Sequence, residues 1–309
     1  MLSVVIPAYN EEQILSKTAD TISRLLAEHN IDYEILFVND GSKDATWSEI
    51  EKAHQQNSHI KGICFSRNFG KEGALFAGMS KAKGDCIVFI DCDLQHPPEL
   101  IPQMYKLWQE GYEVVEGVKK SRGRENFLHR FAAKTFYKLM SSGTDIDMSR
   151  ASDFKLLDRK AVDVLLSMPE RNVFFRALSS WVGFKSTTIE FDVREREAGS
   201  SKWSIPSLVK YAITNITSFS TAPMQIVSIC GIIFFLFSMV LGIQSIYMYA
   251  TNQAETGFTT IILLLLITGT IIMMALGIIG YYVAKIYDEI KGRPKFIISK
   301  FLDSPEESK

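Results

Sequence analysis

Residues 86–99 read Cys86-Ile87-Val88-Phe89-Ile90-Asp91-Cys92-Asp93-Leu94-Gln95-His96-Pro97-Pro98-Glu99. The apolar run at the start predicts a short buried strand, and the polar run after it predicts a turn at the carboxyl end of that strand. Alternate residues of an extended segment face the same way, so we expect Asp91, Asp93 and Gln95 to point together. Carboxylate and amide oxygens suit Mg²⁺ or Mn²⁺, which take their remaining ligands from water and substrate phosphates. The sequence therefore predicts a divalent-cation site at a strand end.

The residues before this segment alternate between two kinds of pattern. Short runs rich in β-branched and aromatic residues predict strands at Leu2–Ile6, Glu34–Val38 and Ile60–Phe65. Segments with helical character lie between the predicted strands, at about Glu12–Glu28, Thr46–His54 and Gly70–Lys83. Strands that alternate with helices predict an α/β fold with an open, mostly parallel, Rossmann-like sheet. Ligands of such sheets bind beyond the carboxyl ends of the strands.

The strand ends carry polar residues but no dinucleotide fingerprint. The first strand runs into Pro7-Ala8-Tyr9-Asn10-Glu11, which is not the G-x-G-x-x-G turn of a dinucleotide-binding domain. After the second strand, Asn39-Asp40-Gly41-Ser42 predicts a turn, and the Asp40 carboxylate could also accept hydrogen bonds from a base or ribose. The third strand ends at Arg67-Asn68-Phe69-Gly70-Lys71, which adds two cations to the same edge of the sheet.

Composition excludes several other classes of protein. The chain has 309 residues and a net charge of −1, so no basic field favours a nucleic-acid partner. The 4 cysteines form no C-x-x-C pair, which argues against a disulfide framework or a zinc site. A strand-like sequence begins at Leu2, so we expect no signal peptide.

The last third of the chain is apolar. Between Tyr211 and Ala284 the only Asp, Glu, Lys, Arg or His is Glu255. Two segments, about 225–250 and 258–284, are long enough to cross a bilayer and are joined by a short turn, so they predict a transmembrane hairpin. The alternative is a hairpin buried inside a soluble protein.

The charges beside the two spans predict their orientation. Lys and Arg crowd both outer flanks, so the positive-inside rule predicts that the α/β domain and both termini lie in the cytoplasm. We therefore expect a multi-pass protein of the cytoplasmic membrane with a domain at 1–205, a membrane domain at 206–290 and a cytoplasmic tail at 291–309. Basic amphipathic runs around Phe127–Lys138 and Lys202–Lys210 predict helices at the membrane surface. For the first run, ordinary packing on the head is an equal alternative, whereas the second leads directly into a span. Glycines in the spans favour a homo-oligomer, for which we expect a tetramer.

Further motifs complete a family pattern. Ser152-Asp153-Phe154-Lys155-Leu156 and Arg196-Glu197-Ala198-Gly199-Ser200-Ser201-Lys202-Trp203 follow the strand-end motifs in order. The chain as a whole resembles the family 2 glycosyltransferases, which have a GT-A fold. With its hairpin it is similar to the polyprenyl-phosphate glycosyltransferases, the group of bactoprenol glucosyltransferases and dolichol-phosphate mannose synthases. The resemblance covers nearly the whole chain.

The resemblance implies a role for each matching residue. The nucleoside of the donor would be held by residues after the first strands: Pro7, Tyr9, Glu11 and Asp40, with Arg67 and Lys71 near it. Asp91, Asp93 and Gln95 would bind the metal and the diphosphate, and Asp153 would lie near the acceptor, so Asp93 and Asp153 are the catalytic candidates. Basic residues would surround the acceptor phosphate: Lys119, Arg122, Arg130, Arg196 and Lys202. The family usually has Arg in place of Lys119, and Lys lacks the bidentate fork of Arg.

The implied reaction is the transfer of a sugar from a nucleotide-diphosphate sugar to undecaprenyl phosphate, with inversion, at the cytoplasmic leaflet. UDP-glucose and UDP-N-acetylglucosamine are the expected donors; GDP-mannose and a modified aminopentose donor are alternatives. Because a phosphate monoester is ionised near neutral pH, the acceptor needs no strong base, so we expect Asp153 to position groups rather than to remove a proton. Three rivals stay open: a processive polysaccharide synthase, whose Gln-x-x-Arg-Trp motif is absent here, an inactive nucleotide-binding scaffold, and a lipid-binding sensor.

Overall fold

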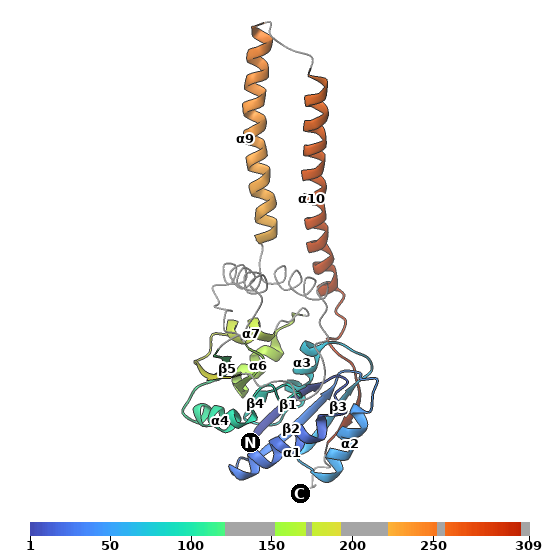
Figure 1. Cartoon of the computed structure of the whole chain (residues 1–309), viewed down its shortest axis with the longest axis vertical. Coiled ribbons are helices and arrows are strands. Elements are labelled where there is room, and N and C mark those ends of the chain that lie inside the picture. The colour runs from blue at the N-terminus through green and yellow to red at the C-terminus, as the bar shows by residue number, and fades with distance from the viewer. Residues whose placement is uncertain (121–151, 171–174, 193–221, 252–256, 304–309) are drawn as a thin grey trace.

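The computed structural model describes residues 1–120, 152–170, 175–192, 222–251 and 257–303. Figure 1 shows an α/β head from which two long helices extend. The strands are β1 (Leu2–Ala8), β2 (Tyr33–Asn39), β3 (Ile60–Phe65), β4 (Cys86–Phe89), β5 (Val114–Lys119), β6 (Lys155–Asp158), β7 (Ser186–Phe191) and β8 (Ile298–Leu302). The helices of the head are α1 (Leu15–Glu28), α2 (Thr46–Gln56), α3 (Lys71–Lys81), the 3₁₀ turn η1 (Pro98–Leu100), α4 (Ile101–Gln109), α6 (Arg159–Ser167) and α7 (Phe175–Trp181). The long helices are α9 (Ala222–Ala250) and α10 (Phe258–Ile290).

One mixed sheet organises the head. Its strand order is β7-β5-β6-β4-β1-β2-β3-β8. The four strands predicted from the sequence form its parallel centre, because β1 pairs in parallel with both β2 and β4, and β2 pairs in parallel with β3. Among the described strands, only β6 and β8 are antiparallel to all of their neighbours. The predicted α/β class with a mostly parallel sheet is therefore confirmed.

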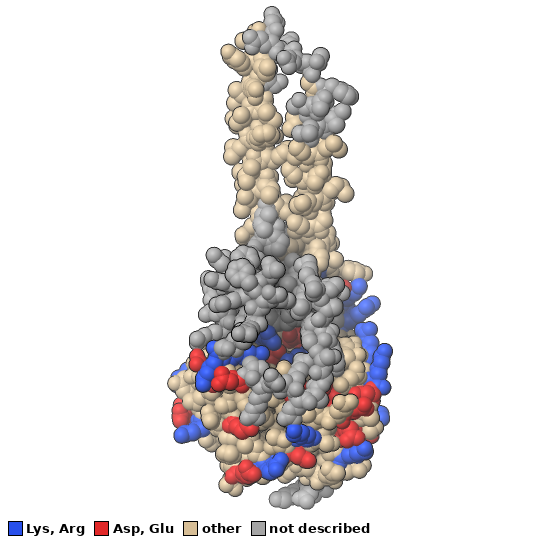
Figure 2. All heavy atoms as spheres, in the orientation of Figure 1, with Lys and Arg blue, Asp and Glu red and all other residues tan. Residues whose placement is uncertain are grey.

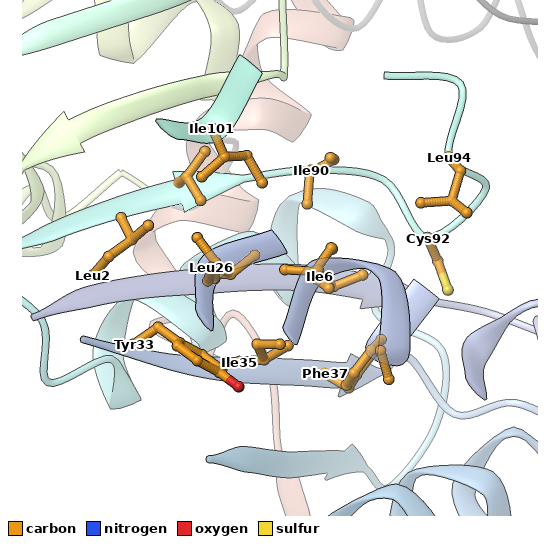
Figure 3. Packing of buried hydrophobic residues seen from close by; sticks show 14 of the residues in the cluster. Leu2, Ile6, Leu26, Tyr33, Ile35, Phe37, Ile90, Cys92, Leu94 and Ile101 are labelled. Atoms are coloured by element: carbon orange, nitrogen blue, oxygen red, sulfur yellow. The ribbon is translucent and has the colours of Figure 1, made fainter. Parts of the chain in front are cut away.

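Helices cover both faces of the sheet, as alternation along the strands requires. In β1, the side chains of Leu2, Val4 and Ile6 pack into one core with α1, α2 and α4, whereas Val5 packs into the other core with α3, α6 and α7. Figure 3 shows part of the first core, in which residues of β1 and β2 meet those of the turn after β4. In α1 the buried residues recur at helical spacing, at Leu15, Ala19, Ile22 and Leu26. Both faces of the central strands are buried, which explains their continuous apolar sequences.

The two long helices agree with the predicted spans. Segments Ile229–Met248 and Leu264–Ile290 are long and apolar enough to cross a membrane, and none of either segment is buried inside the chain. Figure 2 shows the charged side chains on the head, while the two helices above it carry few. The alternative, a hairpin buried inside a soluble protein, would cover these apolar side chains, whereas here they are exposed. The helices therefore favour membrane association.

The chain returns from α10 to the head. β8 pairs antiparallel with β3 at the edge of the sheet, and its five residues, of which the middle three are exposed, were not predicted as a strand from the sequence. Lys61 of β3 lies 2.8 Å from the Asp303 carboxylate just after β8 and 2.9 Å from that of Glu34. Phe296 stacks on Phe65 with ring centroids 5.4 Å apart. Part of the segment predicted as a tail, 291–309, thus belongs to the sheet.

Candidate functional site

The turn after β4 has the alternation that the sequence predicts. Asp91, Asp93 and Gln95 are partly exposed, whereas the residues between them, Cys92 and Leu94, are buried in the core. Figure 3 shows Cys92 and Leu94 turned into that core from the strand end. The hydroxyl of Thr18 donates to the carbonyl of Cys92 at 2.8 Å and ties the turn to α1. Packing on one side of the turn therefore presents the polar side chains on the other.

The carboxylates of Asp91 and Asp153 lie on either side of one ammonium group. Lys71 Nζ is 2.5 Å from Asp91 Oδ1 and 2.8 Å from Asp153 Oδ2. Asp153 also receives two hydrogen bonds from the Arg176 guanidinium, Nε to Oδ1 at 2.6 Å and Nη2 to Oδ2 at 2.7 Å. Four distant parts of the chain are thereby joined: the start of α3, the turn after β4, the segment just before β6 and the start of α7.

Electrostatics in this group keep both aspartates ionised. Burial acts to raise the pKa of Asp153, but attraction to Lys71 and Arg176 outweighs it and holds that pKa well below its usual range. Burial likewise acts to raise the pKa of Asp91, but attraction to Lys71 outweighs it, so this pKa is lowered. The pKa of Lys71 is raised by the two carboxylates despite burial, so its ammonium stays charged at every physiological pH.

Glu72 is the exception among the acids. Its carboxylate accepts a hydrogen bond from the backbone N–H of Phe175 at 2.9 Å, at the start of α7. Burial, followed by repulsion from Asp153, raises its pKa to about 7. We call Lys71, Glu72, Asp91, Asp153 and Arg176 the Asp153 cluster. Within it, α3 contributes two consecutive residues that contact the first two residues of α7 directly or through Asp153.

A second buried ion pair lies beside the cluster. Lys155 of β6 is fully buried, and its Nζ is 2.6 Å from Glu116 Oε1 and 2.6 Å from Ser179 Oγ. Burial lowers the pKa of Lys155. Sequence reasoning missed Glu72, Lys155 and Arg176. A charged residue inside an apolar run, as in Phe175-Arg176-Ala177-Leu178, was the available signal.

His96 is buried against aromatic rings behind the turn. Its ring stacks on Phe154 with centroids 5.2 Å apart and meets Phe191 edge-on at 5.7 Å. Its Nδ1 lies 3.8 Å from Asp91 Oδ2. Burial lowers its pKa despite the nearby carboxylate, so the imidazole is neutral at pH 7.

Asp40 holds the loop that precedes Lys71. Its two carboxylate oxygens accept hydrogen bonds from the backbone N–H groups of Phe69 at 2.6 Å and Gly70 at 2.9 Å. Gly41 must be glycine, because it has a φ of 64° and a Cβ there would lie 2.4 Å from the carbonyl carbon of Arg67. Arg67 itself is exposed, with its guanidinium 4.8 Å from the ring centre of Phe69.

The loop after β1 lies against the loop after β2. The N–H of Asn10 donates to Ser42 Oγ at 2.9 Å, and the N–H of Glu11 donates to Thr46 Oγ1 at 2.9 Å. Pro7 is the next-to-last residue of β1, so Tyr9 and Glu11 follow at its carboxyl end. The predicted nucleoside residues Pro7, Tyr9, Glu11 and Asp40 are thus brought to one edge of the sheet.

The predicted acceptor residues are only partly within the described structure. Lys119 ends β5, and its charge acts on His96. Arg122, Arg130, Arg196 and Lys202 lie outside the described residues, as do both predicted interfacial helices.

The donor set at the strand end fits a hard divalent cation. Two carboxylates and one amide, all partly exposed in one short turn, offer the oxygen ligands that Mg²⁺ and Mn²⁺ prefer. Within the described residues, no group of three or more His, Cys, Asp or Glu side chains is placed to hold a metal ion. A cation here would therefore depend on water and substrate oxygens.

Comparisons with known proteins bear on this geometry. The model of Glycosyl transferase family 2 matches residues 3–166. The uncharacterized glycosyltransferase YkcC of Bacillus subtilis is 40% identical over 303 residues, covering 96% of this chain and 93% of that protein. The SfII prophage-derived bactoprenol glucosyl transferase of Shigella flexneri is 36% identical over 301 residues, covering 97% of each.

Among solved structures, the fold is similar to mannosyl-3-phosphoglycerate synthase from Rubrobacter xylanophilus. That structure aligns with a TM-score of 0.52 at 16% identity and covers 71% of this chain and 72% of that one. The likeness concerns the fold alone. The predicted GT-A-like fold is confirmed.

Proposed function

Because the chain belongs to glycosyl transferase family 2, we propose that this enzyme transfers glucose from UDP-glucose to a polyprenyl phosphate at the inner face of the membrane. The observation that carries the proposal is the pairing, on one chain, of charged strand ends around Asp91 and Asp153 with two apolar helices. A relative of similar length, 36% identical, bears the name bactoprenol glucosyl transferase. UDP-N-acetylglucosamine, GDP-mannose and an aminopentose donor are the alternatives that a donor panel separates.

Asp91, Asp93 and Gln95 are the residues that would hold Mg²⁺ or Mn²⁺ together with the donor diphosphate. When bound, such an ion neutralises the diphosphate and makes it a better leaving group. The same edge of the sheet carries Pro7, Tyr9, Glu11 and Asp40, which we assign to the nucleoside. Arg67 and Lys71 add positive charge near the phosphates.

Asp153 positions neighbouring groups and does not act as a general base. An efficient base has a pKa near the working pH, whereas the pKa of Asp153 is far lower and both of its oxygens already accept hydrogen bonds. The acceptor phosphate supplies its own ionised oxygen, since the second pKa of a phosphate monoester is about 6. The attacking oxygen approaches C1 of the sugar opposite the leaving diphosphate, so we propose inversion at that carbon.

Two anionic substrates must meet, so fixed cations have to lie around the acceptor phosphate. We assign this role to Lys119, Arg122, Arg130, Arg196 and Lys202. Preorganised cations stabilise developing negative charge more strongly where water is excluded. Basic residues on both flanks of the hairpin favour a head and termini in the cytoplasm, beside the lipid headgroups.

The test is a donor panel with the purified protein. UDP-glucose, UDP-N-acetylglucosamine and GDP-mannose are each incubated with undecaprenyl phosphate and Mn²⁺, and the lipid product is identified by mass spectrometry. We expect one hexose added with UDP-glucose, and the proton coupling at the anomeric centre to report inversion. A product with several sugars would instead indicate a processive synthase. No product with any of the three donors would refute hexose transfer and leave the aminopentose donor, tested next in the same assay, and a binding protein.

A further inference from the structure

The ammonium group of Lys71 occupies an oxygen that the proposed metal site needs. It lies 2.5 Å from Asp91 Oδ1 and 2.8 Å from Asp153 Oδ2. Arg176 is bound to the other side of Asp153. Two cations and two carboxylates therefore balance one another before any substrate arrives.

A lysine ammonium and a divalent cation that bind the same carboxylate oxygen repel each other. An oxygen ligand lies about 2.0–2.1 Å from Mg²⁺. With both bound to that oxygen, the ammonium of Lys71 would lie almost in contact with the doubly charged metal ion. Repulsion between them is strong in partly buried surroundings, where water screens charges poorly. Either the lysine leaves Asp91 or the cation binds there only weakly.

The side chain of Lys71 is able to leave, whereas its backbone is not. The side chain is 39% exposed and has a flexible four-carbon stem. The backbone just before it is fixed, since Asp40 accepts hydrogen bonds from the N–H groups of Phe69 and Gly70. The ammonium is therefore the part that can move, and on leaving Asp91 it keeps Asp153 as a partner and gains most from a second anion.

We propose that Lys71 is an internal counter-ion that competes with the divalent cation for Asp91 and moves to a phosphate oxygen of the nucleotide diphosphate when the donor binds. This inference rests on the proposed function, because it takes the same metal site and the same class of donor. Lys71 thereby makes the binding of metal and nucleotide interdependent. Metal alone binds weakly because Lys71 holds Asp91, and the nucleotide removes that competitor.

The test measures Mn²⁺ binding to the purified full-length protein by electron paramagnetic resonance, without nucleotide and with saturating UDP. Lys71→Met should bind Mn²⁺ without nucleotide at least about fivefold more tightly than the wild type, the lower end of typical coupling between two sites. The gain in affinity on adding UDP should shrink by a similar factor. Lys71→Gln serves as the second variant if Lys71→Met does not fold.

Lys81→Met is the matched control. Lys81 ends the same helix, α3, about 15 Å from Lys71 along its axis at 1.5 Å per residue. The variant removes the same charge without touching Asp91, so Mn²⁺ affinity should match the wild type.

Two results overturn the inference in different ways. Unchanged or weaker Mn²⁺ binding in Lys71→Met without UDP, or an equal gain in Lys81→Met, refutes the competition while leaving the metal site intact. A wild-type protein that binds no Mn²⁺ even with UDP refutes the metal site itself, and with it both this inference and the metal-dependent reaction.

Discussion

The guanidinium of Arg176 donates two hydrogen bonds to the carboxylate of Asp153, at 2.6 and 2.7 Å. Such a bidentate pair fixes both the position and the rotation of the carboxylate, which a single ammonium cannot do. Arg176 is the second residue of α7, and the N–H of the first, Phe175, donates to the carboxylate of Glu72 in α3. The position of Asp153 is therefore set by the contacts between α7 and α3 as well as by β6, which begins two residues later.

Replacing Arg176 by lysine should lower kcat by about tenfold, because Lys keeps the charge but loses the fork that orients Asp153. The measurement is kcat and KM for UDP-glucose in the purified protein, with thermal unfolding as a check. Arg159→Lys is the control. Within the described residues, the side-chain hydrogen bonds of Arg159 go to the backbone carbonyls of Ala82 and Gly84 and not to Asp153. An equal loss of kcat in both variants would contradict a specific role for Arg176.

Asp153→Asn should lower kcat by up to about 100-fold, the scale of a misplaced reacting group, without changing the shape of its pH profile. The reason is that the pKa of Asp153 lies well below the assay range, so this carboxylate does not titrate there. The profile is measured from pH 5 to 9 in both proteins. Loss of an acidic limb near pH 5–6 in the variant would mean that Asp153 acts as a base after all.

Glu72→Gln should change the pH dependence of stability. The pKa of Glu72 is raised to about 7 from an ordinary value of 4.5, so the folded protein binds this proton more tightly than the unfolded chain. Its contribution is therefore fully present below pH 4.5 and is lost as pH rises to about 7. Relative to the variant, wild-type protein in detergent should lose thermal stability between pH 5 and 7.5. A difference in Tm that is constant over this range would refute the raised pKa.

Two glycines of α3 give a test of the packing behind the site. A Cβ on Gly78 would lie 2.3 Å from Cγ1 of Val5 in β1, whereas one on Gly73 would lie 3.4 Å from its nearest neighbour, in ordinary contact. Gly78→Ala should destabilise by about 1–3 kcal/mol through overpacking. Gly73→Ala should be neutral or stabilise by up to about 1 kcal/mol through helix propensity. Thermal unfolding of the two variants side by side is the measurement, and equal stabilities would contradict the close approach of α3 to β1.

The sequence predicted the centre of the fold well for a physical reason. β1 to β4 are buried on both faces, so each is a short run rich in apolar residues that a strand pattern detects; the prediction for β3 has the observed bounds, Ile60–Phe65. β8 was missed because its residues are mostly exposed and its stability comes from pairing with β3, more than two hundred residues away. The strand-end position of Asp91 and Asp93 could be predicted, since local alternation determines it.

The charge pairing within the site could not be predicted. Nothing local links Arg176 to Asp153 or Lys155 to Glu116, because each pair is brought together only by the packed sheet and α7. The motif around Lys71 predicted a cation near the nucleoside of the donor but not its contacts with two carboxylates. The roles of the basic residues between 121 and 151 and between 193 and 221 stay predictions.

The most direct test of the central claim is sugar transfer by the purified protein with and without its strand-end carboxylates and metal. UDP-glucose and undecaprenyl phosphate are supplied with Mn²⁺, and lipid-linked hexose is quantified for the wild type, for wild type in excess EDTA and for Asp91→Ala/Asp93→Ala. We predict that product forms only with the wild type in the absence of EDTA. Adding Mn²⁺ in excess of the EDTA should restore transfer by the wild type, whereas the double variant should stay inactive at any Mn²⁺ concentration. Undiminished transfer in EDTA, or by the double variant, would contradict a cation held by these two residues.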